Sequence, residues 1–412
     1  MTDNTTAQGG RVRRRHVFYM SGYDPKGAAW YYQTFATEAA KQASVSGYSI
    51  AVGARTRSGR HIARWPVQYD GEDGQTETVY DFLKWDDIMR RHWPRGDFYL
   101  IWVMARTYGR GIANKTLYNV LKTSWPSFIA GAFPAVFIFL LLLKAIAWGW
   151  VAALIVHFAI GGWGIAGTIA GLLVAGLTLR YGMRWLERFF GTHWLLRIYA
   201  FNQLQARRAV PGLDERLDHF AERIVEAARA NDTDEILVIG HSTGAQGAVT
   251  VLARALERDP DLARRGPVVS FITLGGSIPM LAWQPEAQWF RDDLKRLGEE
   301  KAIPWIDVTT AQDGATFTMC DPLVLAGLAD PSRHGERPKL LSTRLFDLLT
   351  PQTFKKIRRN WYKVHFQYLM AGERPADYDF FAISAGPRTL EQRFAHRPSR
   401  HDFKRFKLRI FR

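Results

Sequence analysis

A serine flanked by glycines, near the middle of the chain, could act as a nucleophile. The motif is Gly240-His241-Ser242-Thr243-Gly244. It follows directly after a short apolar run, and small residues that can start a helix come next. Glycines leave room for a close approach of the backbone. The pattern predicts that Ser242 lies on a sharp strand-to-helix turn. An ordinary glycine-rich turn with an incidental serine is the alternative.

The chemistry that such a serine can perform is acyl transfer. Its hydroxyl attacks a carbonyl carbon when a base takes the proton and an acid orients the base. The backbone N–H of Thr243 would lie at the N-terminus of the following helix, where it could donate a hydrogen bond to the oxyanion that forms. This chemistry needs no further group, so we expect neither a cofactor nor a metal ion.

The strand, the serine turn and the helix start together resemble the α/β-hydrolase superfamily, especially its lipases and esterases. The resemblance is one of motif, and it covers the regions on both sides of the apolar segment described below. It implies the order serine, acid, histidine along the chain. It also implies a second oxyanion donor in a loop after an early strand. Residues 20–25 occupy that place, although they lack the His-Gly pair often found there. The backbone N–H of Tyr23 is the predicted donor. A plain turn that binds nothing is the alternative.

Four aspartates follow Ser242 and could orient the base. Asp307 falls inside the predicted strand at residues 303–308, whereas Asp313 lies in the loop just past its carboxyl end, where the superfamily holds its acid. We predict that Asp313 is the acid. The other candidates, of which Asp321 ranks next, are Asp307, Asp321 and Asp330. Any of these aspartates could instead form a turn or cap a helix.

His365 is the predicted base. It comes after the candidate acids, among aromatic residues, at the expected start of a terminal helix, which is the position that the superfamily uses. There it would take the proton of Ser242 and return it to the leaving group. A histidine packed in the core is the alternative. The remaining histidines considered are His241, which adjoins the nucleophile but is expected to point elsewhere, His334 and His396.

Alternating strands and helices must position these residues. The predicted strands are residues 17–20, 48–54, 235–239, 268–274 and 303–308. The predicted helices are residues 28–43, 81–91, 213–228 and 245–256. Such alternation indicates an α/β fold with a mostly parallel sheet that is covered on both faces. With the resemblance, this becomes an α/β-hydrolase fold interrupted by an apolar insertion.

Two long uncharged runs form that insertion. Residues 125–143 contain no charged residue, and after Lys144, residues 145–179 contain no Asp, Glu, Lys or Arg. Because about 20 apolar residues span a bilayer, we predict a two-helix transmembrane hairpin over residues 123–181, with the second helix starting near the glycines at 161–164. A buried hairpin inside a soluble domain is the alternative.

Basic residues flank the hairpin on both sides. They are Lys115, Lys122, Arg180, Arg184, Arg188 and Arg197. The positive-inside bias therefore predicts that both flanks face the cytoplasm, in a multi-pass protein of a bacterial inner membrane. The chain has 55 Lys and Arg against 39 Asp and Glu, a formal net charge of +16. No nucleic-acid-binding motif accompanies this surplus, so we expect anionic lipid headgroups, not nucleic acid, as the partner.

The expected organisation has five parts. They are a basic N-terminal segment (1–15), the first part of the α/β domain (16–122), the hairpin (123–181), the second part of the α/β domain (182–392) and a basic tail (393–412). The tail could be an interfacial segment or a solvated charge run. The single cysteine, Cys320, excludes an internal disulfide framework and fits a reducing compartment. We expect it to be a buried structural thiol.

These features predict a membrane-anchored serine esterase or lipase that acts on acyl esters in or near the bilayer. The Ser242, His365 and Asp313 triad would work through an acyl-enzyme intermediate. A serine acyltransferase or peptidase on the same fold is one alternative. A non-catalytic membrane scaffold that keeps the hydrolase fold is the other. The acyl chain and the oligomeric state do not follow from the sequence.

Overall fold

The structure is a computed structural model of the 412-residue chain, and it describes residues 10–93, 96–162, 164–400, 404–408 and 410. Contacts divide the chain into two units. The α/β unit consists of residues 1–91 and 205–412, and the helical unit consists of residues 92–204. The helical unit is wider than the predicted hairpin because further helices pack with the hairpin in it.

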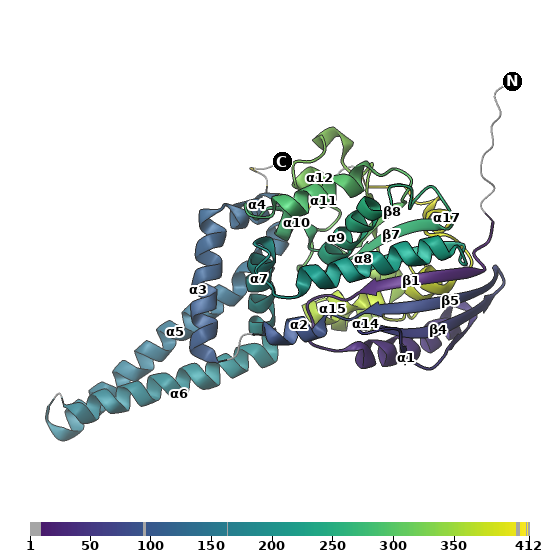
Figure 1. The fold of residues 1–412 in the computed structure, drawn as a ribbon. Coiled ribbons are helices and arrows are strands. Elements are labelled where there is room, and N and C mark those ends of the chain that lie inside the picture. The colour runs from purple at the N-terminus through teal and green to yellow at the C-terminus, as the bar shows by residue number, and fades with distance from the viewer. Residues whose placement is uncertain (1–9, 94–95, 163, 401–403, 409, 411–412) are drawn as a thin grey trace. The chain divides into compact units, whose positions relative to one another are not determined.

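A mixed sheet forms the centre of the α/β unit (Figure 1). Among the described residues its strand order is β2-β4-β5-β1-β6-β7-β8-β9, with β3 paired to β4. The parallel strands are β5 (Gly74–Leu83), β1 (Arg14–Met20), β6 (Glu235–His241), β7 (Val268–Leu274), β8 (Trp305–Thr309) and β9 (Lys339–Ser342). The antiparallel pairs involve β2 (Ser49–Val52), β3 (Thr56–Arg57) and β4 (Ile62–Gly71). The prediction of an α/β fold with a mostly parallel sheet is confirmed.

The β4–β5 hairpin was not predicted, and part of its second strand was wrongly predicted as a helix. Residues 81–83 end β5, and the helix expected at residues 81–91 is reduced to α2 (Asp86–Arg91). Alternate residues of β4 and of the first half of β5 face solvent. An antiparallel pair with a solvated face carries polar residues at alternate positions, so it lacks the continuous apolar run that marks β6.

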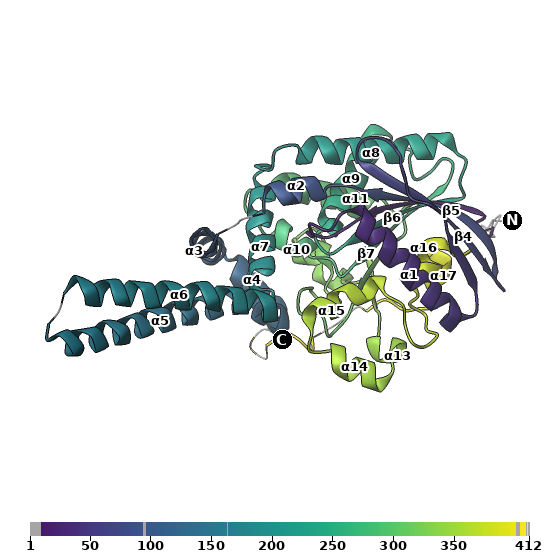
Figure 2. The same cartoon turned by 90° about the horizontal axis from the view of Figure 1, so that it is seen from below.

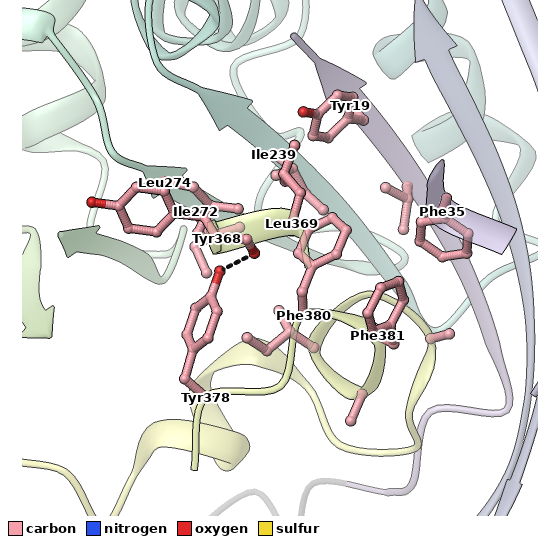
Figure 3. Close-up of a cluster of buried hydrophobic side chains, with 14 of the residues drawn as sticks. Tyr19, Phe35, Ile239, Ile272, Leu274, Tyr368, Leu369, Tyr378, Phe380 and Phe381 are labelled. Atoms are coloured by element: carbon pink, nitrogen blue, oxygen red, sulfur yellow. Dashed lines mark hydrogen bonds between the residues drawn. The ribbon is translucent and has the colours of Figure 1, made fainter. Parts of the chain in front are cut away.

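Helices cover both faces of the sheet (Figure 2). On one face lie α8 (Leu213–Ala230), α9 (Gly244–Arg258) and α11 (Gln288–Glu299). On the other face lie α1 (Ala28–Ser46), α16 (Phe380–Ala385) and α17 (Leu390–Phe394), which pack into one aromatic-rich core with the sheet. Figure 3 shows part of this core, where Phe35 of α1 and Phe380 of α16 lie close to the strand residue Tyr19.

The other helices of the α/β unit are short. They are α10 (Ile278–Ala282), α12 (Pro322–Leu325), α13 (Leu345–Leu348), α14 (Pro351–Ile357) and α15 (Trp361–Phe366), with 3₁₀ turns at Pro331–Arg333 and Gln367–Leu369. α10 follows β7, α12 and the first 3₁₀ turn lie between β8 and β9, and the others connect β9 to the C-terminal helices. Because such short helices are held by tertiary packing more than by their own propensity, sequence periodicity did not reveal them.

The basic N-terminal segment and tail are more firmly packed than expected. Residues 1–9 of the segment lie outside the described residues, and its last two residues begin β1. In the tail, Phe394 ends α17 and is buried in the core. The backbone N–H of Arg400 donates to the carbonyl of Leu340 in β9, 3.1 Å away. Residues 393–400 of the tail are therefore part of the α/β unit.

The helical unit contains α3 (Asp97–Ala113), α4 (Thr116–Thr123), α5 (Trp125–Ile160), α6 (Ile165–Phe190) and most of α7 (Thr192–Ala206). α5 and α6 pair along their length (Figure 1), and both are long and apolar enough to cross a membrane. A Cβ on Gly149 would lie 2.7 Å from the carbonyl oxygen of Gly171. Small residues thus let the two helices approach closely, as is common between helices in membranes.

Candidate active site

Ser242 lies between the end of β6 at His241 and the start of α9 at Gly244. Its φ is +58°, in the left-handed region that non-glycine residues rarely adopt. The turn is held on both sides: the N–H of Ser242 donates to the carbonyl of Leu274 (2.9 Å), and its own carbonyl accepts from the N–H of Ala245 (3.1 Å). Such local strain persists only where the surroundings enforce it, and it is concentrated at functional sites.

Both glycines of the motif are required by close contacts. A Cβ on Gly240 would lie 2.6 Å from the Cα of Ala245, at the start of α9. A Cβ on Gly244 would lie 2.3 Å from the carbonyl oxygen of Met20, at the end of β1. The glycines therefore let α9 begin directly against the ends of two strands, with Ser242 in the turn between β6 and α9.

The loop after β1 passes next to the side chain of Ser242. A Cβ on Gly22 would lie 2.7 Å from the Cβ of Ser242 and 3.1 Å from its Oγ. The N–H of Tyr23, the predicted second oxyanion donor, donates to Oγ1 of Thr243 at 2.5 Å. Gly22 was missed in the sequence; its one signal is a glycine in the loop after the first strand.

His365 and Asp313 form a buried pair. Nδ1 of His365 lies 2.7 Å from Oδ2 of Asp313. Two further groups donate to this carboxylate: the hydroxyl of Tyr368 to Oδ2 (3.2 Å) and the N–H of Ala315 to Oδ1 (3.0 Å). When Nδ1 donates its proton to the carboxylate, Nε2 becomes the basic nitrogen of the imidazole.

The pair lies beside the turn that carries Ser242. The imidazole rings of His365 and His241 have their centroids 5.1 Å apart. Nε2 of His241 lies 3.1 Å from the carbonyl oxygen of His365. The structure thus brings the three predicted residues to the same end of the sheet. His365 does not start a terminal helix as expected: it lies in the last turn of α15, which a 3₁₀ turn follows.

Tyr368 was not predicted as part of the site. It follows His365 by one turn and contacts the same carboxylate. Its own backbone carbonyl accepts a hydrogen bond from the hydroxyl of Tyr378 at 2.7 Å (Figure 3). Tyr378 thereby fixes the segment after α15, and Tyr368 fixes the carboxylate that His365 faces.

The other three candidate acids have structural roles. Oδ1 of Asp307 accepts from the hydroxyl of Thr273 in the neighbouring strand at 2.5 Å. Asp321 caps α12, and Asp330 caps the 3₁₀ turn that follows it. Each carboxylate is therefore engaged away from His365, and Asp313 is the candidate acid that the structure pairs with a histidine.

The other histidines are also placed away from the role of a base. Nε2 of His334 accepts from the N–H of Asp321, and His396 lies half exposed beside Asp377. Burial lowers the pKa of His241 to about 3, and the nearby imidazole of His365 contributes. His241 therefore stays neutral beside His365 and adds no positive charge to the site.

Replacing Asp307 by asparagine is expected to make stability less dependent on pH. Burial raises the pKa of Asp307 to about 7, whereas an unfolded aspartate titrates near 3.9. The folded state thus favours the protonated acid, so the stabilisation is present below about pH 4 and is lost as the pH rises through 7. Between pH 4 and pH 8 the wild type should lose up to about 4 kcal/mol relative to the variant. Urea unfolding at both pH values measures this, and parallel pH profiles would contradict it.

The described residues contain no cluster of three or more His, Cys, Asp or Glu side chains that could hold a metal ion. Cys320 is buried, and burial raises the pKa of its thiol to about 12. The thiolate, which is the reactive form, is therefore not populated near neutral pH. Cys320 is therefore not a reactive thiol in this structure, and Ser242 stays the predicted nucleophile.

A serine in a strained turn, a glycine loop beside it and a buried imidazole–carboxylate pair thus meet at one end of the sheet. These groups come from four separate parts of the chain. Comparisons with protein-family models, with curated proteins and with solved structures find no match for the chain.

Proposed function

We propose that the protein is a serine hydrolase of the α/β-hydrolase type that cleaves acyl esters through a covalent acyl-enzyme intermediate. The observation that carries the proposal is the left-handed conformation of Ser242 between β6 and α9, with the His365–Asp313 pair beside it. A strained serine at this turn is the defining feature of a nucleophile elbow. The mostly parallel sheet, with α9 directly after the serine, is the setting that such an elbow requires.

In the first half of the reaction, Nε2 of His365 would take the proton from Oγ of Ser242 while Oγ attacks the ester carbonyl carbon. The tetrahedral oxyanion would accept a hydrogen bond from the backbone N–H of Thr243, at the N-terminus of α9. Asp313 stabilises the imidazolium and holds its tautomer. His365 then gives the proton to the leaving alcohol oxygen as the C–O bond breaks, which leaves the acyl group on Ser242.

In the second half, His365 would take a proton from water as the water oxygen attacks the acyl carbon. The acid is released and Oγ of Ser242 regains its proton. We keep the N–H of Tyr23 as the second oxyanion donor. Its hydrogen bond to Oγ1 of Thr243 holds it beside the turn, and transfer of this bond to the oxyanion would supply the second donor.

The two long helices support a membrane location for this enzyme. We propose that α5 and α6 cross the inner membrane as a hairpin and that the α/β unit faces the cytoplasm. Three arginines are exposed along the last turns of α6: Arg180, Arg184 and Arg188. Cytoplasmic flanks carry such excess positive charge. An ester that lives in or near the bilayer is then the natural substrate class, and anionic headgroups are the natural partners.

Labelling with a fluorophosphonate probe tests the proposal. The probe reacts with an activated serine, so the wild-type protein should be labelled and Ser242→Ala should not. Ser44→Ala is the matched control, because Ser44 is an exposed serine on α1 whose hydroxyl donates to its own helix. Equal labelling of the wild type and Ser242→Ala would overturn the assignment of the nucleophile.

The probe also separates the alternatives. A non-catalytic scaffold predicts no labelling at all. A serine acyltransferase or peptidase predicts labelling at Ser242 but a different resolution of the acyl-enzyme. Adding an alcohol or amine acceptor to an ester assay distinguishes these outcomes, since a hydrolase releases the free acid as its main product.

A further inference from the structure

α3 is apolar on two opposite faces. One face is buried against the rest of the helical unit through Leu100 and Val103. The opposite face carries large exposed side chains: Phe98 is 79% exposed and Trp102 is 53% exposed. Exposed apolar side chains that lie together mark a surface that binds another molecule or a membrane. The outer face of α3 therefore requires an apolar neighbour.

The buried face fixes where α3 lies along the hairpin. Leu100 and Val103 belong to one apolar cluster with residues of α5 and α6. The residues of α5 and α6 in this cluster are Ile138, Leu141, Ala145, Leu179, Met183 and Leu186. Further along α3, the hydroxyl of Tyr108 donates to the carbonyl of Gly131 in α5. α3 thus crosses the hairpin steeply, since it is seen nearly end-on in Figure 2 while α5 and α6 lie in the plane of the picture, and its N-terminal half lies beside the middle of the hairpin.

The charged residues of the hairpin begin at the level of the N-terminal half of α3. Beyond the exposed residues Lys144 and Arg180, residues 145–160 and 165–179 form a distal part without Asp, Glu, Lys or Arg. At 1.5 Å per residue, this part is roughly 22–24 Å long, against a hydrocarbon core of about 30 Å. The headgroup boundary therefore falls close to Lys144 and Arg180, level with the N-terminal half of α3.

The exposed side chains of α3 at this level are those that membrane interfaces favour. The rings of Tyr99 and Trp102 are stacked with centroids 5.7 Å apart, and the guanidinium of Arg106 lies 5.4 Å from the ring of Trp102. Tyr and Trp are enriched where hydrocarbon meets headgroups. Arginine can place its apolar stem in the hydrocarbon and its charge at the phosphates.

We propose that α3 is a third membrane-contacting helix, which lies in the headgroup interface of an anionic leaflet through Phe98, Tyr99 and Trp102, with Arg106 at the lipid phosphates. This inference rests on the membrane hairpin of the proposed function. Continuity with α5 and α6 through the shared cluster, and the positive charge beside the aromatic rings, identify a lipid surface as the occupant of the outer face.

Depth-dependent fluorescence quenching tests the inference on the full chain. In a Cys320→Ser background, single cysteines are introduced by Ala105→Cys on the outer face of α3, Ile155→Cys on the distal part of α5 and Ser44→Cys on α1; all three positions are exposed. Each protein is labelled with bimane and reconstituted in vesicles of phosphatidylethanolamine and phosphatidylglycerol. The vesicles carry nitroxide lipids spin-labelled either at the headgroup or deep in the acyl chain.

The label at residue 105 is expected to be quenched more by the headgroup nitroxide than by the deep one, and the label at residue 155 to show the reverse. The label at residue 44 should be quenched by neither. Adding Phe98→Ser and Trp102→Ser to the Ala105→Cys protein should weaken quenching at residue 105 without changing quenching at residue 155 in the Ile155→Cys protein.

Two results would overturn the inference, and only one of them would also contradict the membrane hairpin. If residue 155 is quenched but residue 105 is as unquenched as residue 44, the hairpin stands and α3 does not touch lipid; cross-linking between labelled copies would then identify a second chain as the occupant. If residue 155 is unquenched, the membrane hairpin itself is wrong. Neither result affects the labelling of Ser242, which tests the catalytic half of the proposed function separately.

Discussion

Replacing Asp313 by asparagine is expected to lower kcat for a short acyl ester by about 10³- to 10⁴-fold. Asparagine has the same shape as aspartate, so the hydrogen bond that Oδ1 accepts from the N–H of Ala315 can persist. Its amide group, however, can donate a hydrogen bond to Nδ1 of His365. The proton of the imidazole would then move to Nε2, and the base could no longer accept the proton of Ser242. Steady-state kinetics with p-nitrophenyl esters measure the effect.

The matched control is Asp307→Asn. Asp307 is also a buried aspartate, in the middle of β8, but its carboxylate faces Thr273 and not a histidine. This variant should keep the wild-type kcat at neutral pH. If Asp307→Asn lost activity and Asp313→Asn did not, the acid would be assigned wrongly.

A second comparison tests whether Asp313 and His365 act together. Residues that form one catalytic unit have strongly non-additive effects. The double variant Asp313→Asn/His365→Ala should therefore be no slower than His365→Ala alone. Multiplication of the two single losses would mean that the two residues act independently, which their 2.7 Å contact does not suggest.

The centre of the sheet could be predicted from the sequence because local and long-range requirements agree there. β6 and β7 are mostly apolar, and all their residues except Val268 at the start of β7 are buried. The glycine-flanked serine marks the end of β6 by itself. The prediction for β7 matches the observed strand at both ends, since a parallel strand covered by helices is mostly apolar.

The outer strands of the sheet and the short helices could not be predicted from the sequence in the same way. β4 and β5 contain Gln, Asp, Glu and Thr on their solvated faces, a composition that residues 81–91 share with an amphipathic helix. β9 has only four residues, and α15 has six. Elements this short depend on contacts with distant parts of the chain, such as the hydrogen bond between Leu340 and Arg400.

The candidate site was predictable in type but only partly in detail. Chain order limited the acid and the base to residues after Ser242, yet four aspartates satisfied that order. Asp321 and Asp330 cap helical turns, a role that depends on where those turns begin. Gly22 could not be recognised at all, because only the three-dimensional path of its loop brings it to Ser242.

The stability of the α/β unit should depend most on a buried ion pair that has no role in the proposed reaction. Arg15 of β1 and Glu235 of β6 are both fully buried, and Nε of Arg15 donates to Oε2 of Glu235 at 2.8 Å. Arg15 also donates to the carbonyls of Gly386 and Arg388. The other carboxylate oxygen accepts from the hydroxyl of Ser270 at 2.7 Å. The pair therefore joins three strands to the segment that begins α17.

Glu235→Ala is expected to lower the free energy of unfolding of the α/β unit by about 3–5 kcal/mol, because it leaves the Arg15 charge buried without a counterion. Urea unfolding in detergent, followed by circular dichroism, measures the loss. Glu299→Ala is the control: Glu299 pairs with Lys295 on the surface of α11, where both side chains are mostly exposed. Such surface pairs contribute about 0–1 kcal/mol.

The double variant Arg15→Met/Glu235→Leu distinguishes the effect of the uncompensated charge from the effect of the lost hydrogen bonds. Removing both charges eliminates the uncompensated ion, so the double variant should recover most of the stability that Glu235→Ala loses. Full recovery is not expected, since the carbonyls of Gly386 and Arg388 and the hydroxyl of Ser270 would lose their partners. A double variant as unstable as Glu235→Ala would show that the hydrogen bonds that Glu235 accepts from Ser270 and from the N–H of Leu390, and not the buried charge, determine the loss.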